Sequence, residues 1–228
     1  RFLVARYSSM HVTWQGVQGF ETYDRGRDLL REIGGLLKKL DPYNHPRSSD
    51  ALATAGPLAG DGWMTYLIHQ SGDNNLGAIE HQLYAMPLVN VGFGAEDSGA
   101  GASRPGDAGA DAYRRRLWNA TMDGSYPTFA NTGTRAATGS TVDAKYLDSP
   151  AVSQTKVWYD FLSGTRHWEL EPYFDVDGGR AVALEVPHEA EEEVEGIEYI
   201  VYLEKPGPVE IVLQRHNYDV AWVNPITG

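Results

Sequence analysis

The chain has 228 residues, of which 42% are apolar and 11% aromatic, enough to build the core of one large or two small domains. Its formal net charge of −12 argues against nucleic acid and anionic membranes as partners, because contacts with phosphate groups require basic patches. No apolar run approaches the roughly 20 residues that span a bilayer. Cysteine is absent and the histidines lack the spacing of a zinc site, so we expect neither disulfides nor a metal cofactor.

The first 166 residues are predicted to alternate between strands and helices. Leucine and isoleucine recur at helical spacing between residues 24 and 40, while arginine and lysine lie off that stripe, which predicts an amphipathic helix. Ser149-Pro150 places proline at the first position of another helix, which we expect to end near Arg166. Two more helices are expected at 75–84 and 111–122. The expected strands are 10–17, 63–70, the segment after Pro87, and 126–133. Residues 44–50 are expected to form a short strand edge and a loop.

From about residue 167 the apolar period changes from 3.6 to 2, which is typical of strands. Turn residues such as Asp-Gly-Gly and Pro-Gly-Pro separate the candidate strands. We therefore expect two domains, an α/β domain over 1–166 and an all-β domain over 167–228. The five candidate strands of the second domain are 168–174, 180–186, 198–204, 209–214 and 219–223.

The α/β part fits the later strands, about four to eight, of a (β/α)8 barrel. A whole barrel needs roughly 250 residues, so the first strands are expected to be missing from this chain. A doubly wound open sheet is the alternative, and it is weaker because no glycine-rich nucleotide fingerprint follows any predicted strand. An incomplete barrel leaves unpaired strand edges, so we also expect a complementary barrel segment or a second copy of the chain to close the sheet.

The stretch Leu88–Asp97 is the first candidate for chemistry. A short apolar run ends in two glycines and then in two adjacent carboxylates, Glu96 and Asp97. The segment from Val12 to Glu21 has the same build, because it too breaks at glycine and ends in a carboxylate. Carboxylates beyond the carboxyl ends of buried strands are where parallel α/β proteins place their chemistry.

Several segments resemble the apiosidase-like glycoside hydrolases. They are Trp14-Gln-Gly-Val-Gln-Gly-Phe-Glu, Asp41-Pro-Tyr-Asn-His-Pro, Pro87 through Asp97, and Arg115-Arg-Leu-Trp-Asn-Ala. The tail, with Tyr199-Ile-Val-Tyr-Leu and Trp222-Val-Asn-Pro-Ile-Thr-Gly, resembles their C-terminal β domain, of the type named for collagen binding. The resemblance implies a (β/α)8 barrel followed by a small antiparallel β-sandwich, hydrolysis of polysaccharide or glycan side chains, and a secreted or periplasmic location.

The resemblance also implies an acid/base after strand four and a nucleophile after strand seven. The matching positions in this chain are Gly19 and Gly92, which carry no carboxylate. Glu21 and Glu96 lie two and four residues further on and are the predicted catalytic pair. Alternatively, Glu21 is a charge at the start of the next helix, and Glu96 is a loop carboxylate that holds an arginine.

Other side chains at strand ends are candidates for binding a carbohydrate. Trp14 is predicted to stack on a sugar ring, with packing in the core as the alternative. His69 is predicted to bond to a sugar hydroxyl, and the alternative is that it is a buried histidine with a structural role. Hydroxyl groups of a sugar are expected to bond to the remaining candidates. These are Gln18, Gln70, Asp97 and Asn131.

Two hypotheses follow. The first is a glycoside hydrolase with a two-carboxylate mechanism at the C-terminal mouth of the barrel, in which one group protonates the glycosidic oxygen. The second is a catalytically inactive carbohydrate-binding or accessory protein, in which the acid positions have become Gly19 and Gly92. The two differ in whether two carboxyl groups converge at the strand ends.

Overall fold

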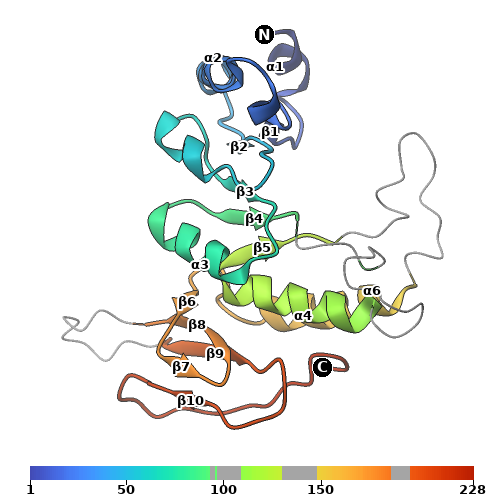
Figure 1. The fold of residues 1–228 in the computed structure, drawn as a ribbon, viewed down its shortest axis with the longest axis vertical. Coiled ribbons are helices and arrows are strands. Elements are labelled where there is room, and N and C mark those ends of the chain that lie inside the picture. The colour runs from blue at the N-terminus through green and yellow to red at the C-terminus, as the bar shows by residue number, and fades with distance from the viewer. Residues whose placement is uncertain (93–95, 97–108, 130–147, 186–195) are drawn as a thin grey trace. The chain divides into compact units, whose positions relative to one another are not determined.

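The computed structural model describes residues 1–92, 96, 109–129, 148–185 and 196–228. It shows a mixed α/β fold with helices and several sheets, and no closed barrel is formed by the described residues (Figure 1). The chain divides into two compact units, one of residues 1–93 with 125–128, the other of 94–124 with 129–228. The predicted domain boundary near residue 166 stays a prediction.

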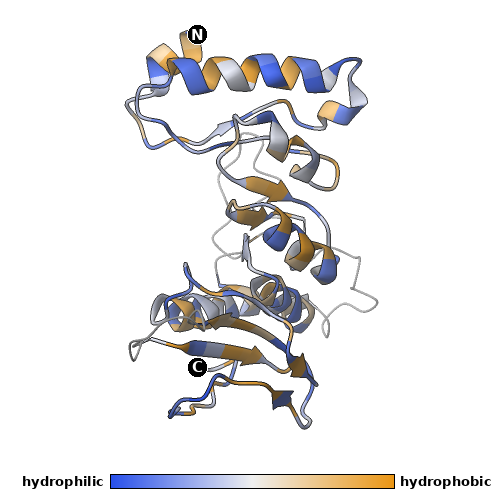
Figure 2. Cartoon of the chain, turned by 90° about the vertical axis from the view of Figure 1, so that its left-hand side faces the viewer, coloured by the Kyte–Doolittle hydropathy of each residue, from blue (hydrophilic) through white to orange (hydrophobic). Residues whose placement is uncertain are grey.

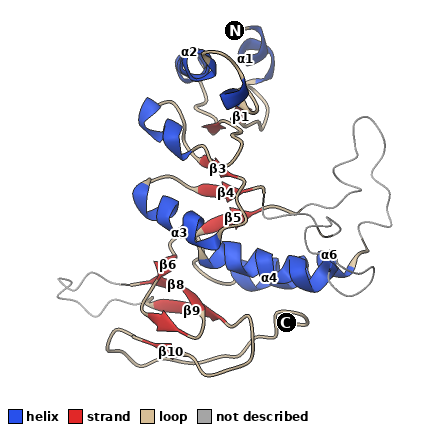
Figure 3. Cartoon of the chain, viewed as in Figure 1, coloured by secondary structure: helices blue, strands red, loops and turns tan. Residues whose placement is uncertain are grey.

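Unit 1 contains two parallel sheets with helices between their strands (Figure 3). In the first sheet Trp14 is in register with Arg47, and in the second Leu67, Leu88 and Ser125 are in register with one another. Its elements are α1 (Phe2–Tyr7), β1 (Trp14–Gln15), η1 (Phe20–Thr22), α2 (Gly26–Leu40), β2 (Arg47–Ser48), η2 (Gly56–Asp61), β3 (Leu67–His69), α3 (Asn74–Leu83), β4 (Leu88–Asn90) and β5 (Ser125–Pro127).

The helix predicted over 24–40 is confirmed as α2, and the strands predicted after Pro87 and within 63–70 are confirmed in shortened form. The strand expected over 10–17 is reduced to Trp14–Gln15. Helix α3 begins as predicted, but its cap is Asp73, whose side chain accepts a hydrogen bond from the Asn75 N–H.

The core of unit 1 gathers around Trp63, which packs directly against α2. A Cβ atom at Gly34 would lie 2.1 Å from the Trp63 ring, so only glycine allows the indole to approach the helix this closely. Figure 2 shows hydrophilic and hydrophobic bands alternating along α2, whose buried residues are Gly26, Leu30 and Gly34. The buried members of this core are Phe20, Leu30, Ala51, Ala55, Leu58, Trp63, Met64, Leu67 and Leu88.

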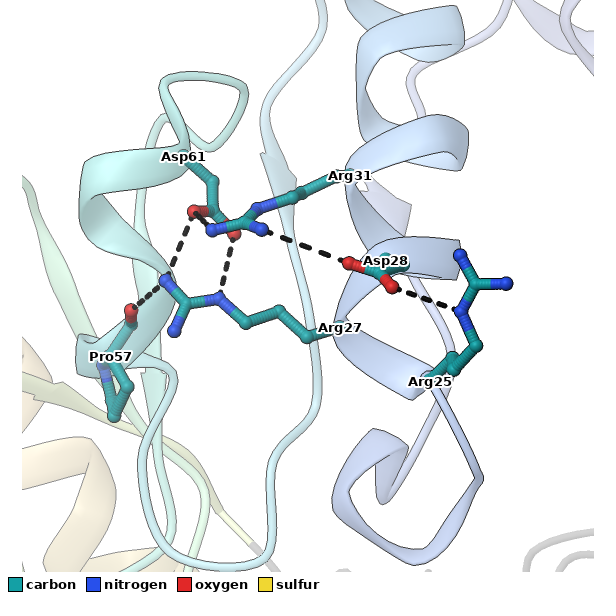
Figure 4. A network of polar contacts seen from close by, with 6 residues as sticks. All are labelled: Arg25, Arg27, Asp28, Arg31, Pro57 and Asp61. Carbon is teal, nitrogen blue, oxygen red and sulfur yellow. Dashed lines mark hydrogen bonds and ion pairs between the residues drawn. The ribbon is translucent and has the colours of Figure 1, made fainter.

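An ion-pair network joins α2 to η2 (Figure 4). Arg27 and Arg31 both donate to Asp61 at 3.0 Å, and Arg27 also donates to the Pro57 carbonyl at 2.9 Å. The Asp61 side chain is only 4% exposed. Burial opposes its ionisation, but the two guanidinium groups outweigh that cost and lower the pKa of Asp61.

A second carboxylate, Asp41, anchors the amino-terminal end of the β1–β2 pair. It accepts hydrogen bonds from the Trp14 indole N–H at 3.0 Å, from the His45 N–H at 2.8 Å and from the Tyr43 N–H at 3.2 Å. The His45 ring Nδ1 lies 2.9 Å from the same carboxylate. Burial raises the pKa of Asp41, but these hydrogen bonds together outweigh it, and the pKa is lowered.

Unit 2 combines two helices with antiparallel strands. Trp118 of the first helix stacks on Tyr202 of the last strand of the larger sheet, with ring centroids 5.6 Å apart and planes inclined by 11°. Trp158 of the second helix donates to Thr121 of the first at 2.8 Å. The elements are α4 (Gly109–Met122), α6 (Pro150–Ser163), β6 (Glu171–Tyr173), β7 (Val176–Asp177), β8 (Arg180–Leu184), β9 (Glu198–Tyr202) and β10 (Glu210–Ile211).

The predicted start of α6 is confirmed, because Pro150 is the first helical residue. In addition, the Ser149 hydroxyl caps the helix by accepting a hydrogen bond from the Val152 N–H. The antiparallel pattern of the tail is confirmed by two sheets, one in the order β6-β8-β9 and one pairing β7 with β10. The strand predicted over 219–223 is wrong, because that segment is irregular, and β7 was not predicted.

Three tyrosines form hydrogen bonds with the segment that follows β10. Tyr173 donates its hydroxyl to the Val212 carbonyl at 2.5 Å, and Tyr218 donates to the Gln214 carbonyl at 2.8 Å. Tyr199 lies between them, edge-to-face with both rings, and donates to the Glu185 carboxylate at 2.6 Å. Burial first, and then Glu185, raises the pKa of the Tyr199 phenol.

The close approach of Trp63 to α2 gives the first testable prediction. Gly34→Ala should destabilise the protein by about 1–3 kcal/mol, because the added methyl group overpacks the core. Gly35→Ala is the matched control, since nothing lies within 4 Å of the position that its Cβ would take. That change should stabilise the protein by about 0.5–1 kcal/mol through helix propensity. Urea unfolding of both variants measures the difference, and equal effects would contradict the packing described.

The Asp41 network gives the second prediction. Because its pKa is lower in the folded than in the unfolded chain, its contribution to stability is complete above the unfolded pKa of about 3.9. The contribution is lost as the pH falls through the folded pKa. Asp41→Asn should therefore reduce the free energy of unfolding at neutral pH and flatten its acid dependence. Unfolding curves between pH 2 and 7 test this, and an unchanged acid slope would show that Asp41 is not the group responsible.

Candidate functional site

The backbone ladder that pairs β1 with β2 continues to Asp50. Trp14 N–H donates to Pro46 at 2.8 Å, Gly16 N–H to Ser48 at 2.9 Å, and Gly19 N–H to the Asp50 carbonyl at 3.1 Å. In the last step the first segment advances three residues while the second advances two, which is the count of a β-bulge. Gly19 has φ 57°, in the left-handed region that favours glycine. The extra residue turns the segment from 18 to 21 toward Asp50.

Side chains from the ends of neighbouring strands meet at the Asp50 carboxyl group. The Gln70 amide, one residue beyond β3, donates to Asp50 Oδ1 and also to the Ala51 carbonyl at 2.7 Å. Gln18, beyond β1, bonds to the same carboxyl group. Glu21 lies close enough to act on the charge of Asp50, and its own carboxylate accepts the Leu52 N–H at 3.1 Å.

The ionisation of Asp50 reflects these neighbours. Desolvation by burial is the largest influence and raises the pKa. The amides of Gln70 and Gln18 oppose it by bonding to the charged form, and the negative charge of Glu21 raises the pKa further. The pKa of Asp50 is therefore raised above its usual value. A carboxyl group that keeps its proton to higher pH suits a proton donor.

Three of the predicted site residues, Gln18, Glu21 and Gln70, are thus brought together. Both glycine positions lie beside them. Gly19 donates its N–H to the Asp50 carbonyl, and the backbone of Gly92 packs on that of Gln70. A Cβ atom at Gly92 would lie 2.1 Å from the Gln70 carbonyl oxygen, so a side chain there requires the backbone to move.

Trp14 and His69 have partners away from Asp50. The Trp14 indole is bonded to Asp41 at the opposite end of the strand pair. The His69 ring is fully buried, and its Nδ1 lies 2.9 Å from Oε2 of Glu80, which also accepts from the Thr54 hydroxyl at 2.8 Å. The contact of His69 matches the structural alternative considered from the sequence, whereas Trp14 is half-buried and is not among the buried core residues. A role in binding carbohydrate stays a prediction for either residue.

Glu96 belongs to unit 2, whereas Glu21 belongs to unit 1. Oε1 of Glu96 accepts a hydrogen bond from the Ala151 N–H at 3.3 Å. Ala151 lies in the first turn of α6, where backbone N–H groups have no partner within the helix. Glu96 therefore acts as a helix-capping carboxylate. The catalytic role predicted for it stays a prediction. Asp97 and Asn131 lie outside the described residues.

Asp50 is not among the site residues predicted from the sequence. The segment Arg47-Ser-Ser-Asp50 was predicted as a strand edge and loop, and its acid was passed over. The signal was present, because Asp50 follows a short strand after a helix, as Glu21 and Glu96 follow theirs. Ser48 was missed as well. Its hydroxyl is fully buried and has no hydrogen-bond partner among the described residues.

Neither a metal site nor a membrane span is found in the parts of the chain that the structure describes. No three His, Asp or Glu side chains there are grouped so that they could hold a metal ion. No helix there combines the length and the apolar character that crossing a membrane requires. Comparison with known proteins gives no match to any family model and no match among curated proteins. The side chains around Asp50 are therefore the basis on which a function is proposed.

Proposed function

We propose that the protein is a glycoside hydrolase of the (β/α)8-barrel type, acting on polysaccharide or glycan side chains. The observation that carries the proposal is the convergence of carboxyl and amide side chains on Asp50 at the carboxyl ends of parallel strands. In barrel enzymes the loops at this end of the strands hold the active site.

The strand arrangement supports the barrel. Every described strand pair in unit 1 is parallel, and α2 and α3 each connect successive strands. The Thr65 N–H donates to the Arg47 carbonyl at 2.9 Å, so the segment leading into β3 lies beside β2. These contacts support the order β1, β2, β3, β4, β5, which successive strands of a barrel would have.

The residue types support hydrolysis of a glycosidic bond. That reaction needs one carboxyl group to protonate the leaving oxygen and a second to meet the oxocarbenium-like transition state or activate water. Asp50 and Glu21 provide two carboxyl groups in one place. Gln18 and Gln70 add amide groups of the kind that bond to sugar hydroxyls.

The rival proposal is a protein that binds carbohydrate without cleaving it. It is favoured by Gly19 and Gly92, because the resemblance expects carboxylates at these two positions. The close contact of Gly92 with Gln70 means that no acid fits there without a shift of the backbone. Under this proposal, Asp50 and its amides would bind hydroxyl groups of a glycan and leave the bond intact.

Closure of the sheet and location remain proposals too. Among the described residues, β1 pairs only with β2, and β5 only with β4. A complementary barrel segment or a second copy of the chain would cover these edges. Secretion or a periplasmic location follows from the family resemblance alone.

Catalysis by the Asp50 site gives the third prediction. The protein should release reducing sugar from at least one member of a panel of plant and algal polysaccharides. Glu21→Gln should lower kcat/KM by about 10²-fold or more, because the variant keeps the shape of the side chain but loses its charge. Glu32→Gln, on the exposed side of α2, is the matched control and should leave turnover unchanged.

The same assay separates the candidate acids. Glu96→Gln should lower the free energy of unfolding by about 0.5–2 kcal/mol, because it weakens the cap of α6. It should leave turnover near that of the unaltered protein. Loss of turnover in Glu96→Gln together with normal turnover in Glu21→Gln would move the catalytic role to Glu96. Binding of a glycan by calorimetry without any release of sugar would favour the rival proposal.

The uncovered strand edges give the fourth prediction. The protein on its own should self-associate, or should become more stable when a complementary barrel segment is added, because pairing satisfies the backbone groups of β1 and β5. Sedimentation velocity over a range of concentrations measures the association. A compact monomer that unfolds cooperatively and gains nothing from an added segment would rule this out.

A further inference from the structure

We propose that Asp50 is the proton donor of this site, the group that protonates the glycosidic oxygen as the bond to the anomeric carbon breaks. The inference rests on the proposed function and deepens it. It assigns the acid to a residue beyond β2, in place of the two glycine positions and of Glu96. Three observations on the described residues carry it.

The first observation is the way Asp50 is held. Gln70 reaches it from the end of β3 and Gln18 from the end of β1, so residues that follow two different strands fix one carboxyl group. The Gly19 N–H donates to the Asp50 carbonyl, and Gln18 and Glu21 on either side of Gly19 both act on the Asp50 carboxyl group. Fixing the reacting group in position is what intramolecular acid catalysis requires.

The second observation is a contrast with Asp61. Both aspartates are partly buried, but Asp61 is bonded to Arg27 and Arg31, which keep it ionised. The groups that act on Asp50 are two neutral amides and a carboxylate, and none of them is a cation. Asp50 is thus held in position without the positive charge that would make it a permanent carboxylate.

The third observation is Ser48. A Cβ atom at Gly16 would lie 2.5 Å from Leu30 of α2 and 3.1 Å from the Ser49 hydroxyl, so Ser49 faces α2. Side chains alternate along an extended segment, so Ser48 and Asp50 share the other face. The Ser48 hydroxyl is fully buried there without a partner among the described residues. A buried hydroxyl without a partner costs free energy, and a water molecule or a sugar hydroxyl would satisfy it.

The reaction balances as follows. Asp50 gives its proton to the glycosidic oxygen, which leaves with both electrons of the broken bond as an alcohol. Glu21 stabilises the positive charge that develops on the sugar. One water molecule supplies the hydroxyl group that the anomeric carbon gains, and its remaining proton restores Asp50. The sum is one glycoside and one water converted to one reducing sugar and one alcohol.

The test compares leaving groups. A substrate whose leaving alcohol is strongly basic needs protonation, whereas a 2,4-dinitrophenolate leaves without it. Asp50→Asn should therefore lower kcat/KM on methyl glycosides by about 10²–10⁴-fold. On 2,4-dinitrophenyl glycosides it should change by less than about tenfold, and the alkaline fall of the pH profile should disappear. Asp24→Asn, an exposed aspartate of the same unit, is the matched control and should change none of these values.

A second variant keeps the inference testable if Asp50→Asn does not fold. Gln70→Met removes the amide that stabilises the charged form of Asp50, so the pKa of Asp50 should rise. The alkaline limb of the kcat/KM profile should then move to higher pH while hydrolysis continues. Circular dichroism and thermal melts establish that each variant is folded.

The two possible failures are distinct. If the unaltered protein hydrolyses neither kind of substrate, the proposed function is wrong. If it hydrolyses both, and a folded Asp50→Asn loses the same factor on both or retains the alkaline limb, the function stands and the assignment of Asp50 is wrong. An alkaline limb that Gln70→Met leaves in place would contradict the assignment equally.

Discussion

The parallel backbone ladder between residues 14–19 and 46–50 is the constraint on which the site of unit 1 depends. It sets which end of each strand meets its neighbour, and it inserts one extra residue opposite Asp50. In a strand with a regular register, successive side chains would point to opposite faces, and the direction of Gln18 would be fixed by that alternation. The hydrogen bond from Gly19 to the Asp50 carbonyl therefore keeps residues 18–21 beside Asp50, where Gln18 and Glu21 act on its carboxyl group.

The two ends of this strand pair are built for different purposes. At the amino-terminal end, Asp41 is enclosed by the Trp14 indole, the His45 ring and two backbone N–H groups, and it is kept ionised. At the carboxyl-terminal end, Asp50 has neutral partners and a raised pKa. The same residue type thus serves packing at one end, and at the other end it is the proton donor that we propose. This division is usual for parallel α/β folds.

Local signals in the sequence were enough to predict the helices. The apolar stripe of α2 and the Ser149-Pro150 start of α6 act within one or two turns, so they need no knowledge of the rest of the fold. Strand limits were less predictable, because they depend on a neighbouring segment. The strand expected over 10–17 keeps only two residues, and residues 219–223 form none. The barrel expected from the sequence remains a proposal.

The site was predictable where it follows a clear strand and not elsewhere. Gln18, Glu21 and Gln70 were found because they come after recognisable apolar segments. Asp50 was passed over because β2 consists of Arg47 and Ser48, two polar residues that are buried only through pairing and packing. The capping role of Glu96 depends on a helix 55 residues further along the chain, and no local pattern indicates such a contact.

Tyrosine side chains hold the segment that follows β10, and the hydrogen bonds they donate depend on their protonation state. A phenolate cannot donate a hydrogen bond, so Tyr173 holds the backbone at Val212 only while it is protonated. The phenol pKa is raised in Tyr173 and Tyr199, so their contribution is complete below the unfolded pKa of about 10 and is lost as the pH rises through the folded value. Strong alkali therefore acts on the tail through these rings. Phenolates absorb ultraviolet light differently from phenols. The absorbance of these side chains therefore reports the pH at which they ionise and their hydrogen bonds are lost.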